Sequence, residues 1–247
     1  MQGFLDSLII NAEKADVSQI IYHIMGVCAI ITAVIFCLIY GKKLKISFLQ
    51  RFFIVLTQIS SMLGIMALVL WAHSGFKTFG GNELTVTFTW VPIIAFVFSK
   101  IAQIDFLKVS DLMAFPPLIV HCIARFGCVF TGCCCGFESK VGIYNIKMDQ
   151  RLFPIQIVES LLTIVIIVLL LRLEKTKYYR KGILTPVMLI LYGCTRCITE
   201  FAHDNTKVLC GLSWVAIYSL AMIIVGTVML YIIVNQSRKK EEPVCNK

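Results

Sequence analysis

The chain has 247 residues, of which 58% are hydrophobic and 15% are charged, and its mean hydropathy is +0.85. This composition excludes a soluble domain of that length and is typical of a multi-spanning membrane protein. The net charge of +9 would favour nucleic acid binding in a soluble protein. In a membrane protein the positions of the charges matter more than their sum, so we expect no nucleic acid partner.

Seven apolar runs are long enough, at about 20 residues each, to cross about 30 Å of hydrocarbon as helices. The expected spans are 17–40, 52–72, 84–101, 112–130, 153–173, 182–201 and 213–234. Pro116 and Pro117 interrupt the fourth run, and prolines in such helices often mark a bend beside a cavity. The first run is too long for a cleaved signal peptide, so we expect it to be retained. The sequence therefore predicts an all-α membrane protein, a single polytopic domain over residues 1–247 with seven transmembrane helices.

The positions of lysine and arginine predict how these spans are oriented. The loops after the first and fifth spans, the C-terminal tail, Lys100 and Lys108 place fifteen basic residues on one side, against six on the other. Cytoplasmic loops carry an excess of lysine and arginine. We therefore expect the amino terminus outside and the carboxy terminus in the cytoplasm.

Polar residues lie within three of the expected spans, in pairs whose members are three or four residues apart and so share a helix face. The pairs are His121 with Arg125, Gln156 with Glu159, and Arg196 with Glu200. In the expected orientation every one of them falls in the outer half of the membrane. Charged residues are usually kept there only where they face a partner or a wet cavity. The sequence therefore predicts one polar site that opens to the outer side.

The residue types of this site suit an anionic lipid head group. The planar guanidinium group binds phosphate through two hydrogen bonds, so Arg125 and Arg196 are candidates to hold the phosphate of a phospholipid. Glu200 or a neutral His121 could take a proton from an incoming nucleophile. Simpler interpretations stay open, because charged pairs can neutralise each other inside a bundle and a buried histidine or glutamine can simply bond a neighbouring helix.

The chain contains 11 cysteines, and several of them lie close to these polar residues. They are Cys128, Cys133, Cys134, Cys135, Cys194 and Cys197. Paired Cys-x-x-Cys knuckles around a turn are missing, so the spacing does not favour metal binding, and we expect neither a metal nor a cofactor. Disulfides at the outer face, or a redox or metal function, stay open as alternatives. Gly127, Gly132 and Gly136 indicate a tight re-entry of the backbone at the rim of the cavity.

Three motifs occur in order between about residues 109 and 204. They are Val109-Ser110-Asp111 followed by Arg125-Phe126-Gly127, Gly132 and Gly136; Pro154-Ile155-Gln156 with Glu159; and Tyr192-Gly193 through Arg196 to Glu200. Together they resemble the motifs of the bacterial prolipoprotein diacylglyceryl transferase family. The expected seven-span topology agrees with this family, and we take 109–204 as the expected catalytic core.

The resemblance implies an enzyme that moves the diacylglyceryl group of phosphatidylglycerol onto the cysteine thiol of a lipoprotein precursor and releases glycerol phosphate. It implies that this occurs at the outer face of the bacterial cytoplasmic membrane. Arg125 and Arg196 match the family's two arginines, which implies that they bind the phosphate and stabilise its departure.

The remaining matched positions imply further roles at the same site. Glu200 matches the acidic residue that accompanies the second arginine. Gln156 and Glu159 match the segment that shapes the site, and Asp111 and Gly127 belong to the first motif. We expect Glu200 to be catalytic, and we expect four residues to contribute to substrate binding: Gln156, Glu159, Gly127 and Asp111.

The chain also departs from the family pattern. The expected His-Gly-Gly is absent from residues 85–92, and Phe153 replaces the histidine expected before Pro154. His121 or Glu200 would then accept the proton, or the acceptor is not the usual lipoprotein cysteine. Two rivals therefore stay open: an enzyme with a different thiol or hydroxyl acceptor, and a lipid-binding or transport protein that has lost catalysis.

Overall fold

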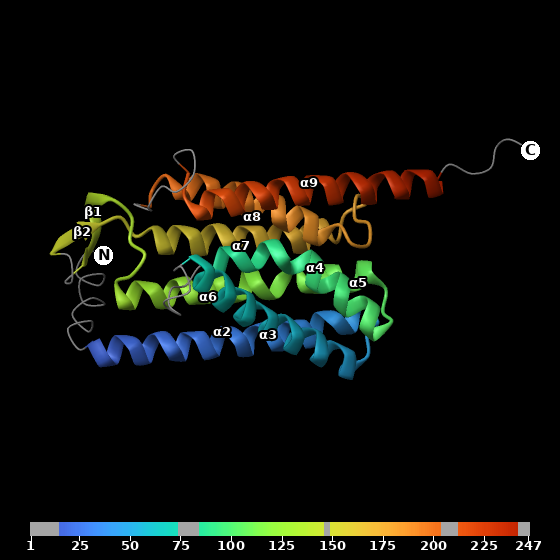
Figure 1. Cartoon of the computed structure of the whole chain (residues 1–247), viewed down its shortest axis with the longest axis horizontal. Helices are drawn as coiled ribbons and strands as arrows, with labels where there is room; N and C mark the ends of the chain where they lie inside the picture. Colours follow the sequence, from blue (N-terminus) through green and yellow to red (C-terminus); the bar gives the residue numbers. More distant parts are fainter. Residues whose placement is uncertain (1–14, 74–83, 146–148, 204–211, 242–247) are drawn as a thin grey trace, which may run out of the picture.

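The computed structural model describes residues 15–73, 84–145, 149–203 and 212–241. Its helices form one elongated bundle (Figure 1). They are α2 (Ala15–Lys43), α3 (Phe48–His73), α4 (Leu84–Ala102), α5 (Phe106–Met113), α6 (Phe115–Thr131), α7 (Ile155–Leu173), α8 (Leu184–Glu200) and α9 (Trp214–Glu241). Each expected span corresponds to one of these helices, the fourth mainly to α6, which confirms that the protein is helical.

Among the described residues, five helices are long and apolar enough to cross a bilayer. The apolar part of α4 is shorter, and α8 has only 17 residues. Some of the basic residues used to predict the orientation lie at 74–83, 204–211 and 242–247, outside the described residues. The structure therefore shows a multi-pass membrane protein, whereas seven spans with the amino terminus outside stay a prediction.

The helix breaks between α5 and α6, where the two prolines predicted a bend. Pro116 and Pro117 occupy the first turn of α6, where a missing N–H costs least. Because Pro117 cannot donate a hydrogen bond, the carbonyl of Met113 four residues earlier loses its helical partner. The buried side chain of Gln58 in α3 donates to that carbonyl at 2.9 Å. A neighbouring helix thus satisfies the backbone group that the proline leaves free.

Asp111 connects two helices at the α5 end of the bundle (Figure 1). The opposite end carries a hairpin of β1 (Glu138–Asn145) and β2 (Gln150–Leu152). The Asp111 carboxylate accepts hydrogen bonds from the Tyr179 hydroxyl at 2.8 Å and from the N–H groups of Gly182 and Leu184 at 2.8 and 2.9 Å. It therefore satisfies free N–H groups at the start of α8. At 1.5 Å per helical residue, Asp111 lies about 20 Å along the bundle from Arg125. The structure thus places Asp111 apart from the expected substrate site.

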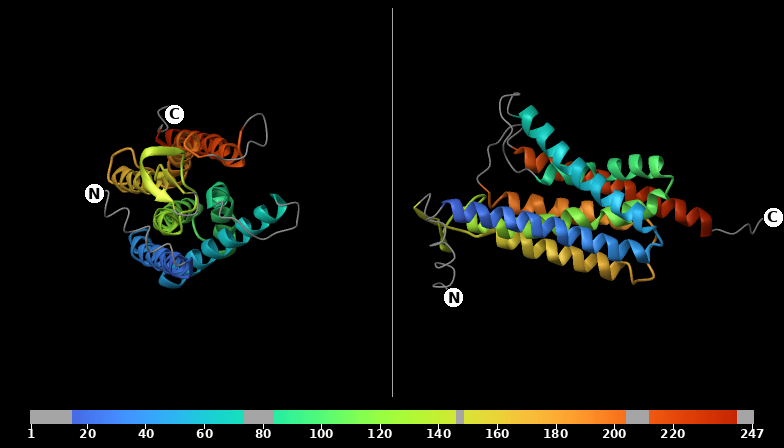
Figure 2. Two further views of the ribbon diagram at one scale, coloured as in Figure 1. Left: turned by 90° about the vertical axis from the view of Figure 1, so that its left-hand side faces the viewer. Right: turned by 90° about the horizontal axis from the view of Figure 1, so that it is seen from below.

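Helix α6 lies between α2 and α7 near the middle of the bundle (Figure 2). Gly127 allows the approach of α2, because a Cβ there would meet the side chains of Tyr22 and Met25 at 3.2 and 3.3 Å. On the other side, the Ser160 hydroxyl of α7 donates to the carbonyl of Cys122 at 3.1 Å. Gly127, which was expected to bind substrate, therefore packs against α2, and this packing fixes where the other face of α6 points.

The chain leaves α6 through a left-handed turn and forms a small antiparallel hairpin. Gly132, with φ of 63°, ends α6 in the conformation that glycine adopts most readily. The strands that follow are β1 (Glu138–Asn145) and β2 (Gln150–Leu152). The tight turn expected at Gly132 is therefore present, and it leads into a hairpin at the end of the bundle.

Candidate functional site

Glu159 of α7 lies at the centre of the polar residues that the sequence assigned to one site. Its carboxylate accepts a hydrogen bond from the guanidinium group of Arg196 in α8. It also forms an ion pair with Nε of Arg125 in α6 at 2.8 Å. The Thr199 hydroxyl donates to Oε1 at 3.1 Å, and His203 Nε2 lies 3.1 Å from the same oxygen. Because Glu159 is only 3% exposed, these groups rather than water stabilise its charge.

The two guanidinium groups are held in different ways. Arg125 uses Nε, which donates to His121 Nε2 at 3.2 Å and faces Glu159. Its two terminal nitrogens form no hydrogen bond with any residue that the structure describes. Arg196 instead uses Nη1 toward Glu159 and Thr199, and its Nη2 lies 4.0 Å from Glu200. Nε of Arg125 is therefore fixed, while its two terminal nitrogens remain able to bind a ligand.

His121 is buried, and both of its ring nitrogens are engaged. The Thr163 hydroxyl donates to the carbonyl of Glu159 at 2.7 Å, so its oxygen accepts from Nδ1–H of His121 at 3.2 Å. The lone pair then lies on Nε2, where it accepts the hydrogen bond from Arg125. His121 in this arrangement is neutral and has no free lone pair. The geometry therefore favours positioning of Arg125 over the expected role of proton acceptor.

Glu200 joins the end of α8 to the start of α9. Its carboxylate accepts a hydrogen bond from the Ser213 hydroxyl and faces Arg196 across one helical turn. The same hydroxyl accepts from the N–H of Ala216 at 3.1 Å and so caps α9. The structure therefore brings Glu200 to the expected site, at its edge rather than at its centre.

Gln156 holds the loop that follows α6. Its side-chain amide donates to the carbonyl of Cys133 at 2.6 Å. Asn145 of β1 donates to the carbonyl of Gly132 at 2.8 Å. Gln156 thus lies one turn before Glu159 and anchors the rim of the site.

Three thiols gather where the last turn of α6 meets this loop, which the cysteine spacing did not indicate. The Sγ atoms of Cys128, Cys133 and Cys134 all lie within 4.8 Å of one another. Cys134 has a left-handed φ of 57°, so the chain turns sharply at this point. Hydrogen bonds from the thiols of Cys128 and Cys134 lower the pKa of the Cys133 thiol, and the charge of Arg125 acts in the same direction. The cluster thus favours a thiolate close to Arg125.

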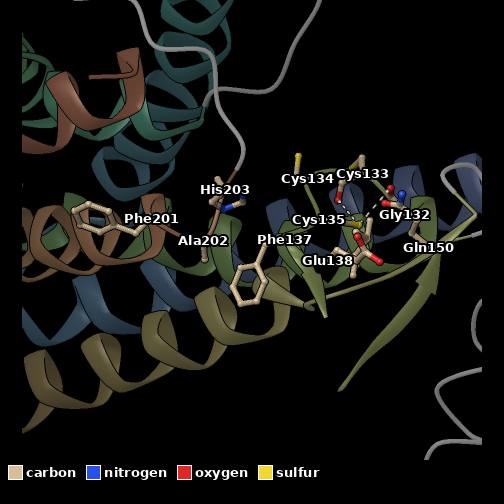
Figure 3. Close-up of a pocket in the computed structure, with 12 residues that line it drawn as sticks. Gly132, Cys133, Cys134, Cys135, Phe137, Glu138, Gln150, Phe201, Ala202 and His203 are labelled. Atoms are coloured by element: carbon tan, nitrogen blue, oxygen red, sulfur yellow. Dashed lines mark hydrogen bonds between the residues drawn. The ribbon is translucent and has the colours of Figure 1, made fainter. Parts of the chain in front are cut away.

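A cavity of about 670 Å³ opens beside these groups (Figure 3). Residues 132–138 line one side of it and residues 201–203 line another, together with Gln150 and Leu152 of the hairpin. Phe137 and Phe201 are exposed at its edge and make part of the rim apolar. By contrast, the space enclosed between His121 and Arg196 measures only about 10 Å³, which holds one water molecule at most. A ligand therefore has room at the rim and not in the space beside Arg196.

His203 belongs both to the cavity wall and to the group around Glu159, and it was not among the candidate residues. It follows α8 by three residues, and its backbone bridges to Gly136. Nε2–H donates to the carboxylate of Glu159, and Nδ1 bonds to no described residue. Its position three residues after Glu200 in the sequence could have indicated that it belongs to the site.

The fold and the site together define a multi-pass helical membrane protein in which two arginines meet one buried glutamate beside a cavity. The model of the prolipoprotein diacylglyceryl transferase family matches residues 8–232, so the chain belongs to this family.

Curated relatives carry matching names. The chain is 30% identical over 151 residues to a phosphatidylglycerol–prolipoprotein diacylglyceryl transferase of Tropheryma whipplei (strain TW08/27). This match covers 56% of each chain. It is 27% identical over 142 residues to a protein of Clostridium perfringens named as the second such transferase, and this match covers 55% of each chain. The matches thus span about half the length of these relatives.

Proposed function

We propose that this protein is a phosphatidylglycerol-dependent diacylglyceryl transferase that modifies the cysteine thiol of lipoprotein precursors at the outer face of the bacterial cytoplasmic membrane. The observation that carries the proposal is the convergence of Arg125 and Arg196 on Glu159 beside a cavity of about 670 Å³. The names of the relatives supply the donor and the acceptor. The proposal includes seven spans with the amino terminus outside, which would put the hairpin and the cavity at the outer face.

In this proposal Arg125 binds the phosphate of the donor lipid directly, and Arg196, which Glu159 holds, adds its positive charge to the site. The ion pair with Glu159 and the hydrogen bond to His121 hold Nε of Arg125, so its terminal nitrogens can meet the phosphate oxygens without first being ordered. As the carbon–oxygen bond of the donor breaks, negative charge grows on the leaving phosphate. Fixed positive groups in a buried setting stabilise such charge strongly.

His203 is the residue that we propose to accept the proton of the incoming thiol. The Glu159 carboxylate fixes its ring through Nε2–H, which leaves the lone pair of Nδ1 for the nucleophile. It lines the cavity, where the acceptor has room. The histidine missing from the family's third-span motif would thus be replaced from the end of α8.

Replacement of His203 by glutamine should reduce the maximal transfer rate by about 10²–10⁴-fold, because a general base contributes about that much. The donor lipid should still bind, since Arg125 and Arg196 are unchanged. The measurement is the rate of peptide lipidation at saturating phosphatidylglycerol, over a range of pH. His23→Gln is the control, because His23 is an exposed residue of α2. An unchanged rate and pH profile in the His203 variant would exclude it as the base.

A transfer assay tests the function itself. Purified protein in detergent is mixed with phosphatidylglycerol and a peptide that carries the lipoprotein cysteine, and release of glycerol phosphate is followed together with lipidation of the peptide. We expect both products in equal amounts. Release without lipidation would indicate a different acceptor, and bound phosphatidylglycerol without release would indicate a lipid-binding relative that no longer catalyses.

A further inference from the structure

We propose that Cys128, Cys133 and Cys134 form a binding site for a thiophilic divalent metal ion, with Zn²⁺ as the representative, and that the acceptor thiol binds at its open coordination position. The proposal that a metal ion binds here rests on the thiol cluster alone. The proposal that the acceptor thiol binds to that metal ion rests on the proposed function.

The geometry of the three sulfurs fits one metal ion. All three Sγ atoms lie within 4.8 Å of one another. Two sulfurs bound to one tetrahedral zinc, each at about 2.3 Å, are about 3.8 Å apart. Shifts of about 1 Å would therefore complete the site. A disulfide would use only two of these thiols and would leave the third beside it.

The backbone holds the three residues in place before any ligand binds. The N–H of Cys133 donates to the carbonyl of Cys128 at 3.3 Å, which folds the loop back over the last turn of α6. The side chain of Gln156 fixes the carbonyl of Cys133, and the left-handed conformation of Cys134 turns the chain at the next residue. The ligands thus come from a helix end and a braced turn, although the sequence has no Cys-x-x-Cys pair there.

The free side of the cluster faces the cavity. Cys128 is buried, whereas Cys133 and Cys134 are exposed and line the cavity wall (Figure 3). Catalytic zinc sites have three protein ligands and an open fourth position, whereas structural sites have four. A metal bound here would therefore have its fourth position toward the space that the proposed acceptor enters.

A zinc ion bound at this site would activate the acceptor thiol. A thiol that coordinates zinc loses its proton, which Nδ1 of His203 on the cavity wall accepts, as in the proposed function. The electron pair of the bound sulfur forms the new bond to the glyceryl carbon of the donor. The bond from that carbon to the phosphate oxygen breaks, and glycerol phosphate leaves with that electron pair. Arg125, one turn before Cys128 on α6, is placed to meet the charge of the phosphate.

Metal binding is tested on the whole protein in detergent, after reduction and removal of metal with a chelator. We expect one Zn²⁺ per chain in competition with a chromophoric chelator, and a thiolate charge-transfer band when Cd²⁺ is used instead. The double variant Cys133→Ser/Cys134→Ser should lose more affinity than the roughly 10–100-fold that follows loss of an outer-shell partner. Cys194→Ser, an exposed cysteine of α8, should bind as the wild type does. Failure of the reduced wild type to bind zinc, or equal affinity in the double variant, would overturn the site.

The acceptor position is tested with Co²⁺, whose visible spectrum reports its ligands. The peptide cysteine should shift the spectrum of the Co²⁺-loaded protein, and the same peptide with serine should not. Transfer at the same rate with and without zinc would overturn the acceptor's place on the metal while leaving the transferase function intact. A cysteine-dependent shift without any transfer would support the metal site and contradict the proposed function.

Discussion

Replacement of Glu159 by alanine should lower the free energy of unfolding by about 3–5 kcal/mol, because it leaves two buried guanidinium groups without their shared carboxylate. Arg125 and Arg196 have side chains only 12% and 6% exposed, so water cannot take over from Glu159. Chemical or thermal unfolding of the purified protein in detergent measures the change. Glu159→Gln keeps the shape but not the charge, and it should lose nearly as much stability.

Glu174 provides the matched control for this prediction. It pairs with Lys43 at 2.7 Å, where the glutamate side chain is 7% exposed but the lysine side chain is 57% exposed. Because water reaches Lys43 when the carboxylate is lost, Glu174→Gln should shift the unfolding midpoint less than Glu159→Gln does. Equal shifts for the Glu159 and Glu174 variants would contradict the central role of Glu159.

Replacement of Arg125 by alanine should reduce the transfer rate by about 10²–10³-fold or more, since fixed groups that stabilise developing charge contribute about that much. Arg125→Lys should recover little, because lysine lacks the planar group that binds a phosphate through two hydrogen bonds. The readouts are the transfer rate and the affinity for phosphatidylglycerol in the same preparation.

Arg151→Ala removes one positive charge from the hairpin at the same end of the bundle and is the control for the Arg125 variant. Arg151 donates to the carbonyl of Gly142 at 3.3 Å and lies on β2. We expect its transfer rate to stay close to that of the wild type. Full activity in the Arg125 variant would exclude a phosphate-binding role for this arginine.

The helices and the pairing of polar residues could be predicted from the sequence, because both follow from local periodicity. The positions of His121 and Arg125 on one face, for example, follow from their four-residue spacing, and the structure shows them hydrogen-bonded. The central position of Glu159 could not be predicted in this way. It depends on contacts with α6 and α8, and Arg196 is 37 residues away in the chain.

Other features depend on backbone turns or on packing that the sequence pattern does not contain. The three thiols meet because α6 ends in a left-handed turn and the loop folds back, which residue spacing alone does not show. Asp111 belongs to the same motif as Arg125, but a helix of 17 residues lies between it and the rim of the site. Motif membership therefore predicted a shared site for Asp111, which lies in α5, and Arg125, which lies in the second half of α6.

The hydrogen bonds of Asp111 set an order for assembly during synthesis. Its partners Tyr179, Gly182 and Leu184 follow it by 68, 71 and 73 residues. At about 5–20 residues per second, a ribosome makes these partners roughly 3–15 s after Asp111. Until then the carboxylate must remain in contact with water or with the insertion machinery. The α5 end of the bundle therefore closes only after α7 and the loop before α8 have emerged.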